Sequence, residues 1–133
     1  MVITESFKIH TEGNTDIIDI TDKVVEKVKN SKVSSGIVTV FIAGSTASIT
    51  TIEYERNLLK DIKEIIEKLI PQDFSYRHPF NAFSHIRSSI FGTSLTIPFK
   101  DKRLILGTWQ QIVLIDFDNR PRVREVILQI IGE

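Results

Sequence analysis

The stretch that decides the fold runs from Gly36 to Pro71 and reads GIVTVFIAGSTASITTIEYERNLLKDIKEIIEKLIP. Residues 36–44 are a β-branched run bounded by glycines, which indicates a buried strand. A second extended run, SITTIEYE, follows after a short turn. The next segment places apolar side chains at helical spacing until Pro71 ends it, at Leu58, Leu59, Ile62, Ile65, Ile66 and Leu69. Two strands and an amphipathic helix are therefore expected here.

The flanking segments add more strands than helices. Residues 2–11, 16–20, 94–99, 103–118 and 121–133 have the composition of strands separated by turns. TDKVVEKVKNS (21–31) predicts a helix that starts at a capping threonine. These elements predict one α+β domain over residues 1–133, mostly antiparallel or mixed β-sheet layers with packed helices.

Composition excludes several classes of protein. The chain has 133 residues, of which 41% are hydrophobic and 26% charged, and its formal net charge is zero. A basic excess that would bind nucleic acid is absent, and no apolar run approaches the roughly 20 residues that cross a bilayer. The chain has no cysteine and no apparent signal peptide, so we expect a cytoplasmic protein. Abundant isoleucine with few Asn, Gln and Met residues suggests a thermophile.

The segment YRHPFNAFSHIRSSIFG, residues 76–92, concentrates candidate chemistry. A short helix over Asn81–Phe91, capped by Asn81, would carry two faces. Phe83, Ile86 and Ile90 share one face, and Asn81, His85, Ser88 and Ser89 share the other. The polar face is either a solvated surface or part of a site. His78 lies seven residues before His85, which matches no short metal motif, so only the fold can join them.

Other candidates lie outside that segment. If the second strand continues to Glu55, Glu53 and Glu55 share one face about 7 Å apart and could hold Mg²⁺ or act as acid and base. Alternatively, Glu55 opens the next helix. The amides of AGSTAS (43–48) could cradle an anion, although a plain turn fits too. Arg120, Arg122 and Arg124 near the C-terminus could bind phosphate. Alternation puts Arg122 and Arg124 on one side of a strand, which a solvated edge would show equally. Trp109 is expected in the core.

Several of these stretches together resemble the YjbQ-like family, whose members are also described as secondary thiamine-phosphate synthase enzymes. The matching stretches are GSTASITTIEYE, YRH, SHIRSSIFGTSLTIPF, LGTWQQIVLIDFDNRPR and QIIGE. The resemblance implies an α+β homotrimer with a polar cleft near the subunit boundary. It also places nine residues on family motif positions: Glu53, Glu55, Asp61, His78, Asn81, His85, Ser88, Thr108 and Gln110.

The resemblance implies a reaction in which a pyrimidine diphosphate joins a thiazole phosphate and pyrophosphate leaves. His85 would donate a proton or hydrogen bond, assisted by His78, with Glu53 also catalytic. Mg²⁺ or another divalent metal would bind Glu53, Glu55 and His85. The substrate would contact Asn81, Arg87, Ser88, Thr108 and Gln110, with Arg87 or a C-terminal arginine neutralising the leaving group.

Two departures from the family pattern limit a histidine-rich metal site. Many members have a histidine where this chain has Phe83, which offers no ligand atom, and another where it has Gly44. Two alternatives to the synthase therefore stand beside it. One is a non-enzymatic trimer that binds a small phosphorylated or carboxylated metabolite, and the other is a metal-dependent hydrolase.

Overall fold

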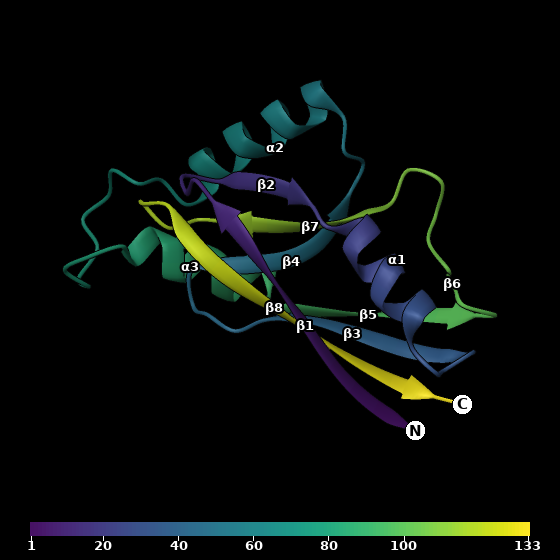
Figure 1. Cartoon of the computed structure of the whole chain (residues 1–133). Coiled ribbons are helices and arrows are strands. Elements are labelled where there is room, and N and C mark those ends of the chain that lie inside the picture. The colour runs from purple at the N-terminus through teal and green to yellow at the C-terminus, as the bar shows by residue number, and fades with distance from the viewer.

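The computed structural model describes all residues, 1–133, and contains eight strands and three helices (Figure 1). In chain order they are β1 (Val2–Thr11), β2 (Asp16–Asp19), α1 (Thr21–Asn30), β3 (Gly36–Ile42), β4 (Ala47–Ile52), α2 (Arg56–Leu69), α3 (Ala82–Phe91), β5 (Ser94–Lys100), β6 (Arg103–Leu104), β7 (Gln111–Asp116) and β8 (Arg122–Gly132). The predicted α+β class is confirmed. No helix is both long and apolar enough to cross a membrane.

The strands form two sheets in which every pairing is antiparallel. The larger sheet has the order β1-β8-β3-β5-β6, and the smaller one has the order β2-β7-β4. Figure 1 shows α2 along one side of the smaller sheet and the larger sheet on its other side. The two chain termini lie close together at one end of the larger sheet (Figure 1).

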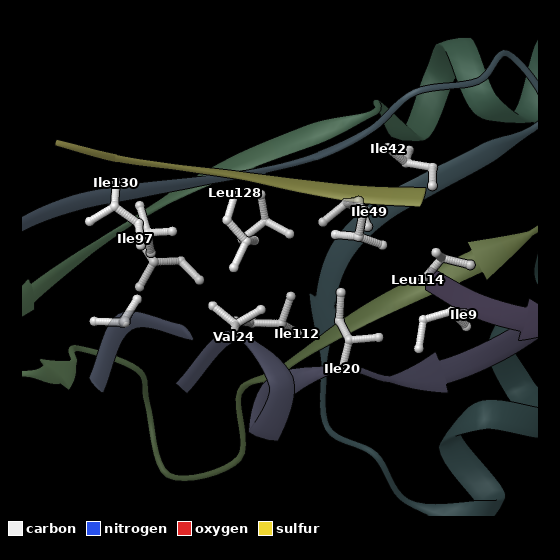
Figure 2. Close-up of a cluster of buried hydrophobic side chains, with 14 of the residues drawn as sticks. Ile9, Ile20, Val24, Ile42, Ile49, Ile97, Ile112, Leu114, Leu128 and Ile130 are labelled. Carbon is white, nitrogen blue, oxygen red and sulfur yellow. The ribbon is translucent and has the colours of Figure 1, made fainter. Parts of the chain in front are cut away.

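The main core lies between the two sheets and is closed by α1. Its side chains come from both sheets and from the buried face of α1, where Val24 and Val28 point inward. Figure 2 shows Leu128 and Ile130 of β8 facing Val24 and Ile112 across this space. Because β-branched side chains fill a pleated surface well, the isoleucine-rich strands explain this close packing.

A smaller cluster packs α2 on the outer face of the β2-β7-β4 sheet. Ile66 of α2 is fully buried against Val113, Ile115 and Phe117. The predicted apolar stripe of α2 is only partly buried, because Ile65 and Leu69 are exposed. The helix therefore covers the sheet with one narrow face.

Three local predictions from the sequence are wrong. Thr21 does not cap α1: the N-cap residue is Ile20, and the Thr21 hydroxyl instead donates to Asp19 at 2.6 Å. The second strand of the central stretch ends at Ile52, so Glu53 and Glu55 do not share a strand face. Trp109 is 70% exposed, because residues 105–110 form a loop that leaves the core.

Helix α3 does not pack through its apolar face, and its buried face lies between the two faces considered from the sequence. The helix buries the polar side chains of Ser84, Arg87 and Ser88. It exposes Ile86 and Ile90. The buried hydroxyls are satisfied: Ser84 Oγ donates to the Phe117 carbonyl and Ser88 Oγ to the Ala47 carbonyl, each at 2.6 Å. Hydrogen bonds to backbone carbonyls at strand ends thus fix this helix, and a pattern based on hydrophobicity cannot show them.

Candidate functional site

A polar hollow of about 450 Å³ lies where the β3–β4 loop, the start of α3 and the segment before β8 meet. Ala43–Thr46 form one wall and Asn81 and His85 another. Asp118–Arg120, Arg122 and Arg124 complete the lining, with Phe80 at the edge. We call this space the cationic hollow because three arginines line it against one carboxylate.

A second hollow, of about 390 Å³, adjoins the first. It is lined by Gly44, Ser45, His85, Ser88, Ser89, Gly92 and Thr93. We call it the hydroxyl hollow because its lining contains four hydroxyl side chains and no Lys, Arg, Asp or Glu. The two hollows share Gly44, Ser45 and His85. The two hollows adjoin at these three residues, and we call the pair the groove.

Arg124 anchors the floor of the cationic hollow. The side chain is 4% exposed, and Nε and Nη2 donate to the two carboxylate oxygens of Asp116 at 2.8 and 2.9 Å. Nη2 also donates to Thr46 Oγ1 at 2.7 Å. Nη1 donates to no atom of the chain, and a methyl group added at Gly44 would lie 3.0 Å from it. This bidentate pair therefore holds the guanidinium in one orientation beside the β3–β4 loop.

Asp118 organises the upper wall of the same hollow. Its carboxylate accepts hydrogen bonds from Arg122 Nη1 at 2.6 Å and from Asn81 Nδ2 at 2.5 Å. Arg122 thereby forms an ion pair with Asp118. Arg120 is exposed and takes part in no ion pair of 4 Å or less. The hollow consequently retains an excess of positive charge.

The two buried carboxylates stay ionised. Burial raises the pKa of Asp116, but hydrogen bonds from Arg124, Thr11 and the Asp118 backbone outweigh it and hold that pKa below its ordinary value. Burial likewise raises the pKa of Asp118, and hydrogen bonds from Asn119 and Asn81 together with Arg122 lower it overall. Both aspartates are therefore negative partners of the arginines at neutral pH.

Asn81 holds an unusual backbone conformation at the edge of the hollow. Its φ is 53°, in the left-handed region, and its side chain makes no capping hydrogen bond to α3. Asn81 is the N-cap residue, as predicted, but its side chain does not cap α3: Nδ2 donates to Asp118, and Oδ1 accepts from no backbone N–H of the helix. The Asn81 Oδ1 atom is buried without any hydrogen-bond donor. Such orphaned acceptors and strained residues gather at functional sites.

The β3–β4 loop offers unused donors to the groove. None of the backbone N–H groups from Ala43 to Thr46 donates a hydrogen bond within the chain. Ser45 is exposed, and its hydroxyl has no partner either. Loop amides without acceptors beside arginines are the donors that bind anions in proteins. The anion cradle considered from the sequence stays a prediction, which these unpaired donors support.

The fold brings His78 and His85 together. Their ring centroids lie 5.3 Å apart, with the rings tilted by 52°. His78 is exposed, and its Nδ1 accepts a hydrogen bond from the Phe80 backbone at 3.3 Å. His85 lines both hollows, whereas His78 lines neither. His85 is therefore the histidine placed to contact a ligand in the groove.

Other residues predicted for the site lie at the far end of β4. Glu53 and Thr108 line a separate hollow together with Trp109. The six residues of β4, at about 3.3 Å each, put this end about 20 Å from the β3–β4 loop. Figure 1 shows the β3–β4 loop with α3 at one end of the sheets and the β6–β7 loop at the other. Within one chain, Glu53 and His85 therefore do not share a site.

Glu55 and Gln110 have structural partners at this far end. The Glu55 carboxylate caps α2, accepting hydrogen bonds from the backbone of Asn57 at 2.7 Å and of Leu58 at 3.0 Å. Glu55 therefore opens helix α2, which was the alternative to a metal-binding or acid–base role. Gln110 closes its own loop, with Oε1 accepting from the Gly107 backbone at 3.0 Å. Asp61 is exposed on α2.

Arg87, predicted to bind substrate, is a buried structural residue instead. It is 1% exposed and donates to the Ile70 carbonyl through Nε at 3.0 Å and Nη2 at 2.6 Å. It also pairs with Glu67 at 2.7 Å, while Nη1 donates to Thr15 at 3.3 Å. Every nitrogen of the guanidinium thus has a protein acceptor. Ser88 does line the hydroxyl hollow, but its hydroxyl is committed to Ala47.

The residues expected to hold a divalent metal do not fit that role within one chain. His85 and the Glu53–Glu55 pair lie at opposite ends of β4, and Glu55 is occupied as a helix cap. No three His, Asp or Glu side chains converge into a group that could hold a metal ion. The expected ligand set therefore does not assemble within one chain.

Asp116 and Asp118 are the residues that sequence reasoning missed. They follow the apolar run of β7 in IVLIDFD, and both are buried. A charged residue that extends a buried strand is itself a signal, because burying a charge requires a partner. The alternating arginines of RPRVRE supply the partners. Reading the two segments together would have predicted this network.

The fold and the groove define a small antiparallel α+β protein with a cationic surface site. Comparison with known proteins supplies its family. The family model described as UPF0047 protein YjbQ-like matches residues 5–133, and the chain belongs to this family.

Named relatives share most of the chain. A UPF0047 protein of Archaeoglobus fulgidus is 38% identical over 124 residues, covering 91% of this chain and 95% of the relative. A solved YbjQ-like protein of unknown function from Sulfolobus solfataricus has a TM-score of 0.96 at 32% identity, covering 100% of this chain and 99% of that one. A hypothetical protein from Aeropyrum pernix K1 has a TM-score of 0.93 at 34% identity, covering 98% and 99%.

Proposed function

We propose that this protein binds a small phosphorylated or carboxylated metabolite in the groove. One observation carries the proposal: Arg120, Arg122 and Arg124 converge with the β3–β4 loop in a hollow that contains a single carboxylate. Arg124 is held rigidly by Asp116, so it loses little freedom when a ligand binds. The free loop amides would surround the anion, and His85 would donate a further hydrogen bond.

The size of the hollow suits a small ligand. A volume of about 450 Å³ lies within the usual range for small-molecule sites. The zero net charge of the chain disfavours a long polyanion, which needs an extended basic surface. Asp116 and Asp118 offset the charges of Arg124 and Arg122, so the local excess is the one positive charge of Arg120, which is enough for a small anion. We therefore propose a metabolite rather than a polymer as ligand.

Calorimetric titration with inorganic phosphate tests the proposal. We expect saturable binding to the native chain and about five- to tenfold weaker binding to Arg120→Gln, which removes an unpaired cation from the hollow. Arg103→Gln is the matched control, since Arg103 is exposed on β6 outside the groove. Equal affinities of the two variants, or no binding to the native chain, would refute the proposal.

A second candidate is thiamine-phosphate synthesis, which is favoured by His85 beside the arginines that would receive a diphosphate. The new bond would join the pyrimidine methylene carbon to the thiazole nitrogen as pyrophosphate departs. His85 would donate a hydrogen bond or proton to the leaving group, with His78 at its side.

Formation of thiamine phosphate from the two precursors tests this candidate. Purified protein would be compared with His85→Ala, which should lose activity, and with His10→Ala, which should keep it. His10 is exposed on β1 and lines neither hollow. Absence of product with the native chain would exclude the synthase and leave the binding proposal standing.

A further inference from the structure

The two halves of the groove differ in chemistry. The cationic hollow contains all of the charged side chains that line the groove, and the hydroxyl hollow contains none. Three hydroxyls in the second hollow, those of Ser45, Ser89 and Thr93, have no hydrogen-bond partner within the chain. Each can both donate and accept a hydrogen bond. This end of the groove is suited to an uncharged polar group.

The lining also excludes other kinds of ligand group. No hydrophobic residue lines the hydroxyl hollow, although carbon atoms of its Gly, Ser, Thr and His residues contribute more of its surface than polar atoms do. No carboxylate lines it, so an ammonium group would find no partner. A group with several hydroxyls would match the unpaired Ser and Thr side chains and the N–H groups of the β3–β4 loop.

A single ligand can reach both hollows. They meet at Gly44, Ser45 and His85, and they provide about 450 and 390 Å³. His85 at the junction is placed to contact the ester oxygen that links the two parts of such a ligand.

We propose that the ligand is a phosphorylated polyhydroxy compound, such as a sugar or polyol phosphate. Its phosphate occupies the cationic hollow, and its hydroxyls bind the side chains of the hydroxyl hollow. This inference rests on the proposed anion-binding function and adds the chemical class of the organic part.

Phosphate esters of equal charge and different organic parts test the inference. We would titrate the native chain with inorganic phosphate, ribose 5-phosphate and propyl phosphate by calorimetry. The ribose hydroxyls can form two or more hydrogen bonds that propyl phosphate cannot form. We therefore expect ribose 5-phosphate to bind about tenfold more tightly than propyl phosphate. Equal or tighter binding of propyl phosphate would overturn the inference.

A double variant locates the effect. Ser89→Ala with Thr93→Val removes two unpaired hydroxyls and should reduce the ribose 5-phosphate advantage to less than about threefold. Affinity for inorganic phosphate should not change. Ser94→Ala is the control, because Ser94 is exposed beside the groove without lining it. An advantage that survives in the double variant would overturn the inference.

The results also separate the two proposals. If inorganic phosphate does not bind the native chain, the anion site itself is wrong, and the inference falls with it. If phosphate binds and the ribose moiety adds nothing, only the assignment of the organic part is wrong.

Discussion

At the scale of single residues, the groove depends on charges that are buried and paired. Arg124 and Asp116 are 4% and 0% exposed and bind each other through two hydrogen bonds. Removing one partner of such a pair leaves an uncompensated charge in the interior. The network therefore supports both the fold and the orientation of the anion site.

We expect Arg124→Leu to lower the free energy of unfolding by about 3–5 kcal/mol, since it strands the Asp116 carboxylate. Arg120→Gln, on an exposed residue of the same hollow, should change it by less than about 0.5 kcal/mol. Urea denaturation of both variants measures the difference. Similar stabilities for the two would contradict the structural role of the pair.

The same residues show where sequence reasoning succeeds and fails. His85, Asn81 and the 43–48 segment were singled out from residue type and spacing, and the two side chains line one hollow together with residues 43–46. Arg87 was misplaced, because its acceptors include the Ile70 carbonyl, which no side-chain pattern reveals. Residue chemistry thus predicted candidates, and tertiary hydrogen bonds determined which of them face the groove.

At the scale of helices and strands, single side-chain hydrogen bonds determine where an element begins or ends. Glu55 ends the extended run after β4 by capping α2. Glu55→Ala should therefore destabilise the protein by about 0.5–2 kcal/mol through loss of the cap. Glu53→Ala, two residues earlier and exposed, should be nearly neutral. Thermal denaturation compares them, and equal effects would argue against the cap.

Strands β3 and β8 approach closely at Gly36 and Gly132, which lie opposite each other. A methyl group on Gly36 would lie 1.9 Å from the Ile131 carbonyl oxygen, so Gly36→Ala must force the strands apart. We expect a loss of about 1–3 kcal/mol in the free energy of unfolding. Gly107→Ala is the control, since its nearest neighbour would be 3.5 Å away. An unchanged free energy of unfolding in Gly36→Ala would contradict this prediction, because it would mean that β3 and β8 can move apart at this point without loss of stability.

The order of strands and helices in the 36–71 stretch was predictable because β-branched runs and helical spacing are local signals. The burial of α3 was not, because its inward face is polar. Trp109 was misplaced because its loop is anchored to the core by Leu106 and closed by Gln110, which leaves the indole exposed. Elements were thus predictable wherever hydrophobicity alone determined their packing.

At the scale of the whole molecule, the buried aspartates link stability to pH. The pKa values of Asp116 and Asp118 are lower in the folded state than their ordinary values, so the unfolded chain binds more protons in acid. Their stabilisation is complete above the ordinary aspartate pKa of about 4 and is lost as pH falls through the folded values. The urea concentration at the midpoint of unfolding should therefore decrease as the pH is lowered below about 4. Asp118→Asn should flatten this fall, and an unchanged pH profile in that variant would contradict the assignment.

The homotrimer implied by the family resemblance stays a prediction. An exposed apolar row crosses the open face of the larger sheet, where Val2, Ile131 and Ile37 are cross-strand neighbours. Burying that row against other copies would remove apolar surface from water. Sedimentation equilibrium should give three times the 15.2 kDa chain mass. A monomer mass would contradict this expectation.

An amide NMR titration of the native chain with inorganic phosphate would show directly where the anion binds. We expect saturable shifts of the Gly44 and Ser45 amides, which are unpaired donors of the loop that lines the cationic hollow. The Thr108 amide and the Trp109 indole, at the other end of β4, should not respond. Saturable shifts at that far end, or none in the β3–β4 loop, would contradict the assignment of this groove as the anion site.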